Sequence, residues 1–350
     1  MKVGVYRQFL GGLHQGYLQR YEEILNFNEI ECIWLEGSCA NFWRRVGELD
    51  LFIYQWEHYN EPRQIAETII PIIEFEMGIP CFPNWATTWH YDDKIKQYYL
   101  LKYHGFPIIE SFIFWDRDKA FEWLDSAGMP VVFKLKGGAG SSNVILVEDT
   151  ANARRLISKM FGRGIKSGKV PDKSSLQRRN FNPYRRIRRL AGNLLREMRG
   201  GTEPLFWQVD RGYVLFQEFL PGNLFDTRVS IIGERAFAFR RFNRENDFRA
   251  SGSGHIDYDT RQIDFRCIEI AFKISKELGF QSMSYDFLFN EEKEPEISEI
   301  SYTYVDTAVY NCPGFWDKDF KWQEGHFWPQ YLQLMDALGM PDLKQPIIIK

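Results

Sequence analysis

Residues 130–148 read PVVFKLKGGAGSSNVILVE, a pattern of two short strands around a glycine-rich turn. The first strand, 131–133, delivers Lys134 to the turn 137–142, and a second apolar strand at 144–147 leads away. Glycine permits positive φ and a close approach of the backbone, so successive N–H groups in such a turn can form an anion-binding nest beside the lysine. The pattern predicts a hairpin that holds a polyphosphate, but a hairpin without a ligand has the same pattern.

The order of these residues excludes two familiar phosphate-binding motifs. In a P-loop the lysine follows the glycines, whereas Lys134 precedes them and no Gly-Lys-Ser or Gly-Lys-Thr follows. In a dinucleotide-binding turn a third glycine opens a helix, whereas Asn143 stands at that position and a strand follows. The hairpin belongs to neither class, so its partners must be sought elsewhere in the chain.

The composition is that of a globular chain with more than one domain. Its 350 residues are 44% hydrophobic, which supports two or three packed cores. No apolar run approaches the roughly 18 residues of a membrane-spanning helix, and the first residues read as a buried strand, not a signal peptide. The five cysteines are scattered without a CxxC pair, and the six histidines lack an HExxH spacing. This pattern disfavours disulfides and zinc, and predicts a cytoplasmic protein.

The charge is unevenly distributed along the chain. The net charge is −3, yet residues 163–199 hold twelve Lys or Arg and two acidic residues, so this stretch carries +10 and the remainder −13. Within it, 182–200 has the apolar spacing of an amphipathic helix. Such a helix either packs on its lobe with a solvated basic face, or contacts an anionic membrane or a lipid-linked sugar pyrophosphate. Nucleic acid is disfavoured, because no recognised nucleic-acid module is present and the rest of the chain is acidic.

The order of strand and helix patterns predicts three regions. Residues 1–92 alternate strands with helices, which is typical of a Rossmann-like α/β domain with a parallel sheet. Residues 93–216 contain the glycine hairpin and a basic helical insert at 163–203. Residues 217–350 contain a strand meander, a long helix and a second hairpin. The fold class predicted is therefore α/β, with α+β lobes after the first domain.

The second hairpin, YDFLFNEEKEPEISEIS at 285–301, contains two carboxylates at facing positions. If its turn centres at 292–293, Asp286 lies directly opposite Glu299, with Cβ atoms about 5 Å apart. Carboxylates this close repel each other unless a cation lies between them, and Mg²⁺ is suited to that place. Ser301 shares the face of Glu299 by strand alternation. A register shifted by one residue would instead put the carboxylates on a solvated face.

The order of these segments resembles the ATP-grasp superfamily over about residues 90–305. The fourth of five short motifs is very similar to the corresponding run in ligases that add glutamate to a ribosomal protein. Ser301 departs from the pattern, in which an Asn is usual. The motifs are Asp92-Asp93-Lys94, the glycine hairpin with Lys134, Gln217-Glu218-Phe219-Leu220, Asp226-Thr227-Arg228 with Arg240-Arg241 and Asp247-Phe248-Arg249-Ala250-Ser251, and Asp286 with Glu299-Ile300-Ser301.

The resemblance implies an ATP-grasp fold and a role for each matched residue. Residues implied to contact ATP are Lys94, Lys134, Gly138, Gly140, Ser141, Glu218, Phe219, Leu220 and Asp226. Residues implied to hold Mg²⁺, for which Mn²⁺ could substitute, are Asp286, Glu299 and Ser301. Residues implied to act on the transferred phosphate and the substrate carboxylate are Arg249, Arg228 and Arg240.

The activity implied by the resemblance is that of a carboxylate–amine ligase that forms an amide through an acyl phosphate. The substrates would be small molecules, such as a sugar acid or an amino acid, and similar chains suggest bacterial cell-surface polysaccharide biosynthesis. Many such ligases are dimers or tetramers, so a homo-oligomer is implied by analogy. A small-molecule kinase or phosphotransferase and a non-catalytic ATP-binding protein remain alternatives.

The first domain offers no motif that identifies the acceptor substrate. Tyr6, Arg7, Trp56 and His58 occupy the carboxyl ends of its expected strands, where ligands bind in parallel sheets. His58 and His90 have no visible partner in the sequence. Both histidines are therefore interpreted as packing or surface residues.

Overall fold

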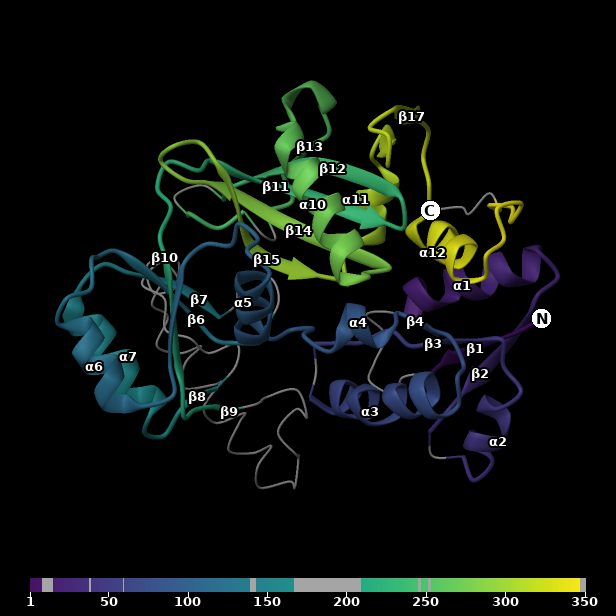
Figure 1. Ribbon diagram of the computed structural model, residues 1–350, viewed down its shortest axis with the longest axis horizontal. Helices are drawn as coiled ribbons and strands as arrows, with labels where there is room; N and C mark the ends of the chain where they lie inside the picture. The colour runs from purple at the N-terminus through teal and green to yellow at the C-terminus, as the bar shows by residue number, and fades with distance from the viewer. Residues whose placement is uncertain are drawn as a thin grey trace, which may run out of the picture.

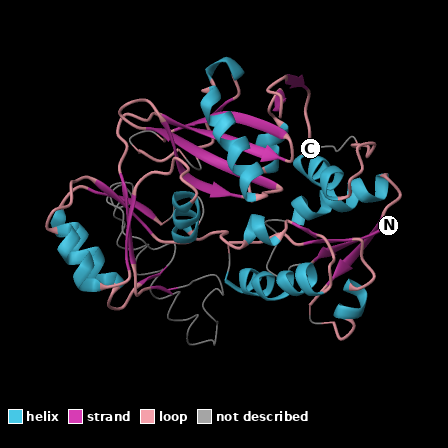
Figure 2. Ribbon diagram, in the orientation of Figure 1, coloured by secondary structure: helices cyan, strands magenta, loops and turns pink. Residues whose placement is uncertain are grey.

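The computed structural model describes residues 1–7, 15–37, 39–58, 60–138, 143–166, 209–244, 247–250 and 253–346. These residues form three main sheets, with the N-terminal sheet, the central sheet and the C-terminal sheet arranged around a common centre (Figure 1). Helices cover the outer faces of the sheets (Figure 2). In the part of the chain so described, no helix is both long and apolar enough to cross a membrane.

The N-terminal sheet is parallel, as the alternating pattern predicts. Its strand order is β2-β1-β3-β4, and every neighbouring pair runs parallel. The helix before β2 packs on the sheet because Tyr21, Ile24 and Leu25 lie one turn apart on one face and are all buried. The elements are β1 (Lys2–Tyr6), α1 (Gln15–Phe27), β2 (Glu31–Leu35), α2 (Phe42–Val46), β3 (Leu51–Ile53), α3 (Asn60–Pro71), η1 (Ile72–Glu76) and β4 (Cys81–Phe82).

The central sheet is antiparallel and contains the predicted glycine hairpin, β6–β7. Its strand order is β5-β10-β6-β7. The helices α6 and α7 pack beside each other at the left of Figure 1, and their apolar residues complete a separate core. The elements are β5 (Ser111–Phe114), α6 (Arg117–Leu124), β6 (Val131–Lys134), β7 (Val144–Val147), α7 (Thr150–Met160), and β10 (Val214–Glu218).

The C-terminal sheet contains the predicted meander and the carboxylate hairpin. Its main path is β15-β14-β11-β12-β16-β17, with β13 beside β12, and α10 packs on β11 and β14. Asp286 pairs with Glu299 as predicted, but a bulge between Asp286 and Phe287 produces this pairing: nearer the turn the strands pair one residue away from the expected register, with Phe289 opposite Pro295. The elements are β11 (Phe225–Ile232), β12 (Arg235–Phe242), β13 (Ile256–Asp257), η2 (Thr260–Gln262), α10 (Phe265–Leu278), β14 (Ser282–Phe289), β15 (Pro295–Ser301), β16 (Gly314–Asp317) and β17 (Trp322–Glu324).

Short elements join the sheets. The helix α5 packs against β15, and α12 returns the chain to α1 of the first sheet, where Leu334 joins the N-terminal core. Its Gln333 side chain accepts a hydrogen bond from the Tyr21 hydroxyl at 2.5 Å, which ties the end of the chain to the first domain. These elements are α4 (Trp85–Thr88), α5 (Lys94–Tyr103), β8 (Ile165–Lys166), β9 (Val209–Asp210), α11 (Asp306–Tyr310) and α12 (Pro329–Ala337).

The two largest hydrophobic cores group the sheets differently from the three regions predicted from the sequence. One core joins the N-terminal and C-terminal sheets, with Trp56 and Tyr285 in the same cluster, while the central sheet has its own core. The expected boundary at 216/217 falls inside β10, which belongs to the central sheet as far as Glu218. Of the basic insert 163–203, only 163–166 are among the described residues, so the helix expected at 182–200 lies outside them.

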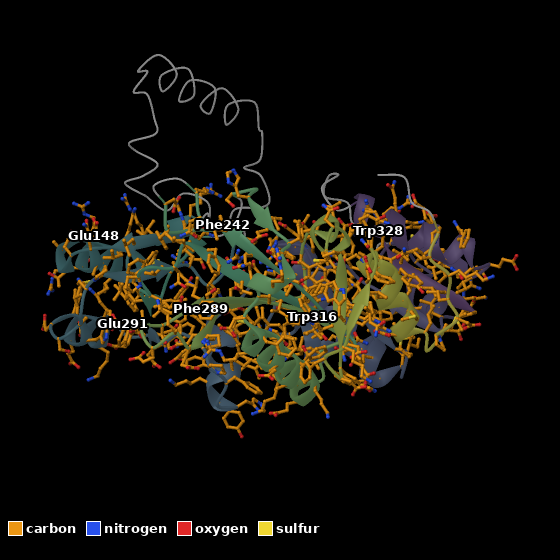
Figure 3. All side chains as sticks on the ribbon, turned by 90° about the horizontal axis from the view of Figure 1, so that it is seen from above. Glu148, Phe242, Phe289, Glu291, Trp316 and Trp328 are labelled. Atoms are coloured by element: carbon orange, nitrogen blue, oxygen red, sulfur yellow. The ribbon has the colours of Figure 1, made fainter. Side chains whose placement is uncertain are left out.

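A view from above, with the long axis still horizontal, shows where the sheets meet (Figure 3). Glu148 marks the central sheet, Phe242 and Phe289 mark the near ends of β12 and β14, and Trp316 and Trp328 follow toward the first domain (Figure 3). The ends of β12 and β14 therefore face the central sheet. The junction between these two sheets is where the pocket described below opens.

Candidate active site

A pocket of about 240 Å³ opens between the central and C-terminal sheets. Its walls come from β6, from the segment after β10, and from β11, β12, β14 and β15. The structure thus brings together residues that are distant in the sequence. Lys134 and Glu299, for example, are 165 positions apart. The residues expected at the site that line this pocket are Lys134, Glu218, Phe219, Leu220, Asp226, Arg249, Asp286 and Glu299.

The glycine hairpin begins in a conformation that requires glycine. Gly138 has φ of +110°, and a Cβ atom there would lie 2.1 Å from Asn143 Nδ2. Its N–H donates to Asp92 Oδ1 at 2.7 Å, and Lys94 Nζ donates to its carbonyl oxygen at 3.2 Å. The start of the turn is therefore held by the segment that opens α5. Gly140 and Ser141, expected to contact phosphate, lie outside the described residues.

Two lysines stand at the inner end of the pocket. Lys134 Nζ donates to the carbonyl oxygen of Ser298 at 3.5 Å, and Lys94 Nζ lies 3.1 Å from Glu299 Oε1. Burial, together with the nearby Lys94 ammonium and against the opposing effect of Glu299, lowers the pKa of Lys134 to about 8. Burial also opposes the charge on Lys94, but the Glu299 and Asp92 carboxylates outweigh it and raise that pKa.

The segment 217–220, which comprises the last two residues of β10 and the two that follow, also lines the pocket. Gln217 is buried and donates to Ser111 Oγ at 3.2 Å, so it holds the strand in place. Glu218 is exposed, and burial followed by the Glu296 and Glu110 carboxylates raises its pKa. The pocket wall between this segment and the lysines is apolar, with Ile109, Val132, Phe219, Leu220 and Leu288.

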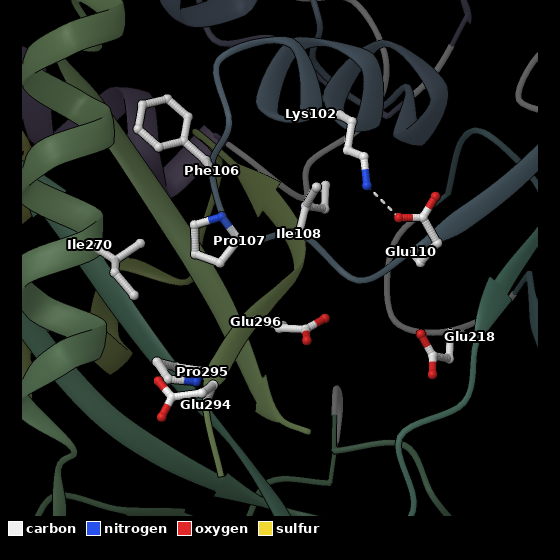
Figure 4. Close-up of a pocket in the computed structure, with 10 residues that line it drawn as sticks. All are labelled: Lys102, Phe106, Pro107, Ile108, Glu110, Glu218, Ile270, Glu294, Pro295 and Glu296. Atoms are coloured by element: carbon white, nitrogen blue, oxygen red, sulfur yellow. Dashed lines mark hydrogen bonds and ion pairs between the residues drawn. The ribbon is translucent and has the colours of Figure 1, made fainter. Parts of the chain in front are cut away.

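A second hollow of about 460 Å³ lies on the other side of Glu218 (Figure 4). Glu110, Glu218 and Glu296 surround it, and Lys102 forms an ion pair with Glu110. It contains none of the lysines or glycines of the hairpin. The smaller pocket differs from it in bringing Lys134, Arg241 and Arg249 together with an apolar wall.

Asp286 is the most strongly bonded residue of the site. Arg228 donates to both of its oxygens, at 2.7 and 2.8 Å, and Arg241 Nη2 donates to Oδ2 at 2.8 Å. Arg241 also holds Asp226 through two hydrogen bonds of 2.7 and 2.5 Å. Burial would raise the pKa of Asp286, but the two guanidinium groups hold it far below its usual range.

The three arginines expected to act in catalysis occupy different surroundings. Arg228 lies beneath the pocket on Asp286. Arg249 lines the pocket, and it donates to Asp247 at 2.8 Å and to the carbonyl oxygen of Val144 on β7 at 3.0 Å. It thus spans from the C-terminal part of the chain to the glycine hairpin.

The expectation for Arg240 is corrected by the structure. Arg240 points to the opposite face of β12, where its guanidinium donates to Asp257 at 2.5 Å and lies over the Phe225 ring. Side chains alternate along a strand, so the next residue, Arg241, faces the pocket in its place. Arg241 pairs in register with Asp226, which gives that carboxylate its cation.

Comparison with solved structures relates this arrangement to a known fold. A RimK domain ATP-grasp protein from Sphaerobacter thermophilus DSM 20745 aligns over 88% of this chain and 93% of its own, with 14% identity and a TM-score of 0.52. The chain has the ATP-grasp fold. The D-alanine–D-alanine ligase of Bacillus anthracis aligns over 86% of each chain, with 14% identity and a TM-score of 0.53. The ATP-grasp ligase PsnB bound to a minimal precursor aligns over 96% of this chain and 97% of its own, with 14% identity and a TM-score of 0.55.

The likeness is one of fold, because no relative in sequence accompanies it. No protein-family model matches the chain, and no curated protein matches it. Within the ATP-grasp fold, the Bacillus ligase has also been solved in complex with ATP, and PsnB with Mg and ADP. The pocket between the central and C-terminal sheets can therefore be tested for its fit to the same two ligands.

The donors expected for a metal fit only in part. Glu299 faces the pocket, is 36% exposed at its side chain, and keeps one oxygen beyond its pair with Lys94. Asp286 lies opposite it, but both of its oxygens are bonded by arginines, and Ser301 Oγ donates to the carbonyl oxygen of Thr303 at 2.8 Å. Nowhere in the described ranges do three or more His, Cys, Asp or Glu residues form a metal-binding group. Glu299 is thus the donor that fits a metal carried by the nucleotide.

Two residues of this site were given no role in the sequence analysis. Arg241 was named beside Arg240 in the matched motif, but only the pairing of β11 with β12 and β14 shows that it is the arginine beside Asp226 on the face of Asp286. Asn143 was also missed. It was read as the position of a missing glycine, yet its Nδ2 donates to the carbonyl oxygen of Gly137 at 2.9 Å and closes the turn. Only the folded hairpin shows that contact.

Proposed function

We propose that this protein is an ATP-dependent ligase that joins a carboxylate to an amine through an acyl phosphate. One observation carries the proposal: Lys134 from the central sheet, Arg249 beside it, and Glu299 from the C-terminal sheet line a single pocket with an apolar wall. An apolar wall suits a purine base, and converging cations suit a triphosphate. Ligases that form such bonds share the fold.

The nucleotide would lie with its base at the segment 217–220 and its phosphates at the lysines. Glu218 and the backbone of Phe219 and Leu220 would form hydrogen bonds with the base, and the apolar residues of the wall would pack against its faces. Asp226, held by Arg241, would lie toward the ribose. Lys94, Lys134 and the start of the turn at Gly138 would bind phosphate oxygens, and we extend this role to Gly140 and Ser141.

The chain's own residues supply most of the charge stabilisation. Phosphoryl transfer needs chiefly positioning and neutralisation, so no protein nucleophile is required. A Mg²⁺ or Mn²⁺ ion carried by the nucleotide and held by Glu299 would neutralise phosphate charge. Asp286 would order Arg228 and Arg241, and Arg249 would stabilise the transferred phosphate.

The reaction would proceed in two steps. The substrate carboxylate attacks the γ-phosphorus, and ADP leaves with the electron pair of the broken P–O bond. The amine then attacks the acyl carbon, and phosphate leaves. We propose Arg228 and Arg249 as the cations nearest the carboxylate, with Arg240 removed from this role by its position on the opposite face.

The finer assignments rest on the sequence, in part on its composition and in part on the resemblance. They are a sugar acid or an amino acid as the carboxylate, a place in cell-surface polysaccharide biosynthesis, a cytoplasmic homo-oligomer, and an anionic membrane or lipid-linked sugar at the basic insert. We keep the division into 1–92, 93–216 and 217–350 as a proposal, with the last strand of the central sheet extended to Glu218.

A turnover assay separates the ligase from its alternatives. The purified protein is incubated with ATP, Mg²⁺, sugar acids, amino acids and amines, with hydroxylamine as a trap. A ligase releases ADP and free phosphate and yields a hydroxamate, whereas a kinase leaves the phosphate on its product. A protein that only binds ATP releases neither, and that result would refute the proposal.

The matched variants are Glu299→Gln and Glu296→Gln, which remove the same charge from neighbouring positions of β15. Glu299 faces the nucleotide pocket, whereas Glu296 lines the hollow of Figure 4. We expect the first substitution to lower kcat/KM at least a hundredfold and the second to change it less than threefold. If both substitutions changed kcat/KM by the same factor, Glu299 would have no specific role in the reaction.

A further inference from the structure

A second cluster of polar side chains lies outside the nucleotide pocket. Glu57 and His58 follow β3 at the carboxyl edge of the N-terminal sheet, and Tyr91 and Asp92 precede α5. His58 Nδ1 lies 3.5 Å from Asp92 Oδ1 and 3.1 Å from the Tyr91 hydroxyl. The Tyr91 hydroxyl lies 2.9 Å from Thr303 Oγ1. His58, for which the sequence showed no partner, thus has partners in the folded chain.

Glu57 contributes a buried carboxylate oxygen that lacks a hydrogen-bond partner among the described residues. Its side chain is 3% exposed, and no described residue forms a hydrogen bond with its Oε2 atom. Burial raises the pKa of this carboxyl to about 7, with His58 acting in the opposite direction. Buried polar atoms are nearly always hydrogen-bonded, because an unmade bond costs roughly 1–3 kcal/mol. A ligand with N–H donors would supply the missing partner.

The cluster adjoins the proposed site of phosphoryl transfer. Asp92 accepts from the N–H of Gly138 through the same Oδ1 atom that faces His58. Two residues further on, Lys94 pairs with Glu299. A substrate held by Glu57 and His58 would therefore lie next to the start of the glycine hairpin, where the acyl phosphate would form.

The charge of the cluster favours a cationic group. Glu57 and Asp92 are carboxylates and His58 lies between them, while the nearby cations are already engaged. Lys94 pairs with Glu299, and Arg63 donates to the carbonyl oxygen of Asp92 at 3.4 Å. An ammonium group suits this arrangement, whereas a second carboxylate would be repelled.

We propose that Glu57 and His58 form the subsite that receives the amine substrate as its ammonium form, with Asp92 positioning His58. This inference rests on the proposed ligase function. With Nδ1–H directed at Asp92, His58 Nε2 carries the lone pair that takes one proton from the ammonium. The amine nitrogen then bonds to the acyl carbon, the bond from that carbon to the phosphate oxygen breaks, and the second N–H proton leaves with phosphate as HPO₄²⁻.

A binding measurement tests the subsite without turnover. Protein with ¹⁵N-labelled histidine is saturated with a non-hydrolysable ATP analogue and Mg²⁺, and D-glucosamine, glycinamide or ethanolamine is added. The His58 signal is assigned with His58→Gln. At least one amine should shift that signal, N-acetyl-D-glucosamine should not, and Glu57→Gln should weaken the binding at least fivefold. No shift with any of the three amines, or binding that survives Glu57→Gln unchanged, overturns the proposal.

The controls separate this outcome from misfolding and from failure of the ligase proposal. The signals of the other five histidines report whether Glu57→Gln retains its fold. Glu67→Gln removes the same charge from α3 and should leave amine binding unchanged. An amine that binds at His58 without any turnover would refute the ligase and retain the subsite. Turnover with an amine that never perturbs His58 would do the reverse.

Asp92 is a positioning residue, and its test uses Asp92→Asn. Asp92 has φ of +51°, a conformation that Asn tolerates, and an Asn oxygen can still accept from the Gly138 N–H. We expect kcat with an accepted amine to fall at least tenfold while KM for ATP changes less than twofold. A raised KM for ATP with an unchanged kcat would show that Asp92 only holds the glycine hairpin.

Discussion

Lys134 is buried, and burial disfavours its positively charged form. Binding a phosphate, however, requires that charge. Its pKa is lowered to about 8 by burial, while the Lys94 ammonium adds to this effect. Above that pH the free protein presents a neutral amine, whereas bound phosphate would favour the ammonium. Nucleotide binding should then take up a proton, so Kd for an ATP analogue should rise by up to about tenfold per pH unit between roughly pH 8 and 10.

Fluorescence titration over this range measures the effect, and Lys134→Arg is its control. The guanidinium group stays charged throughout, so the arginine variant should lose the dependence. If the same rise in Kd persists in Lys134→Arg, another group titrates and Lys134 does not contact the phosphates.

Asp286 and Asp257 form a natural comparison, because each carboxylate binds an arginine of β12 on opposite faces of one sheet. The Asp286 side chain is 10% exposed and holds two guanidinium groups, whereas the Asp257 side chain is 28% exposed and holds Arg240 alone. Removing one partner from a buried ion pair costs about 3–5 kcal/mol. An exposed pair contributes at most about 1 kcal/mol. Urea unfolding should therefore show a much larger loss of stability in Asp286→Ala than in Asp257→Ala.

Equal losses in the two variants would contradict the burial of the Asp286 network. The arginine network around Asp286 also affects what a loss of activity in Asp286→Ala would mean. An inactive Asp286→Ala protein would not by itself prove metal binding, because the two arginines lose their order at the same time. Glu299→Gln is the cleaner substitution, since Glu299 is half exposed and pairs only with Lys94 among the ion pairs of the described residues.

The glycine hairpin is the element whose backbone most directly limits substitution. Gly138 combines a φ of +110° with a Cβ position 2.1 Å from Asn143 Nδ2, so Gly138→Ala must distort the turn. Strained backbone of this kind costs of order 1–3 kcal/mol. We expect ATP affinity to fall at least fivefold, measured by calorimetry.

Gly128→Ala is the matched control, because Gly128 lies just before the same hairpin and a Cβ there meets nothing within 4 Å. Its affinity for ATP should equal that of the unsubstituted protein. A Gly138→Ala protein with full affinity would show that the phosphates do not depend on the turn's conformation.

The two hairpins show how far local sequence can predict such elements. The pairing of Asp286 with Glu299 was predicted correctly, but it depends on a bulge between Asp286 and Phe287 that the position of the turn does not predict. The choice between Arg240 and Arg241 was not local. It depends on which face of β12 meets the central sheet, and that face is set by packing between segments distant in sequence. The partner of His58 was hidden for the same reason, since Asp92 belongs to another element.

Short elements escaped prediction for a related reason. The helices α2 and α11 have five residues each, and β16 and β17 form a hairpin with little alternation in hydrophobicity. Periodicity needs several turns to become visible, so these segments depend on contacts with the rest of the fold. By contrast, α10 spans 14 residues with a continuous buried face and was predicted correctly.

At the scale of the whole molecule, the arrangement of cores indicates which parts can move. The N-terminal and C-terminal sheets share one core, whereas the central sheet has a core of its own. Among the described residues, the side chains that cross the pocket between these two cores include Arg249 on Val144 O and Lys134 on Ser298 O. Units with separate cores and small interfaces move relative to each other more readily than parts of one core.

Nucleotide binding should therefore close the central sheet onto the C-terminal sheet. Amide hydrogen exchange with and without an ATP analogue and Mg²⁺ measures this. We expect at least tenfold slower exchange in β7 and in the segment 217–220, which border the pocket, and no change in β1 and β3, whose Val3, Val5, Leu51 and Ile53 lie in the N-terminal core. Arg249→Lys should reduce the protection of β7, because a lysine cannot reproduce the guanidinium contacts to Asp247 and Val144 together. Uniform protection across all three sheets would mean that the molecule tightens as one body, and the hairpin would then be a fixed wall of the pocket and not its moving side.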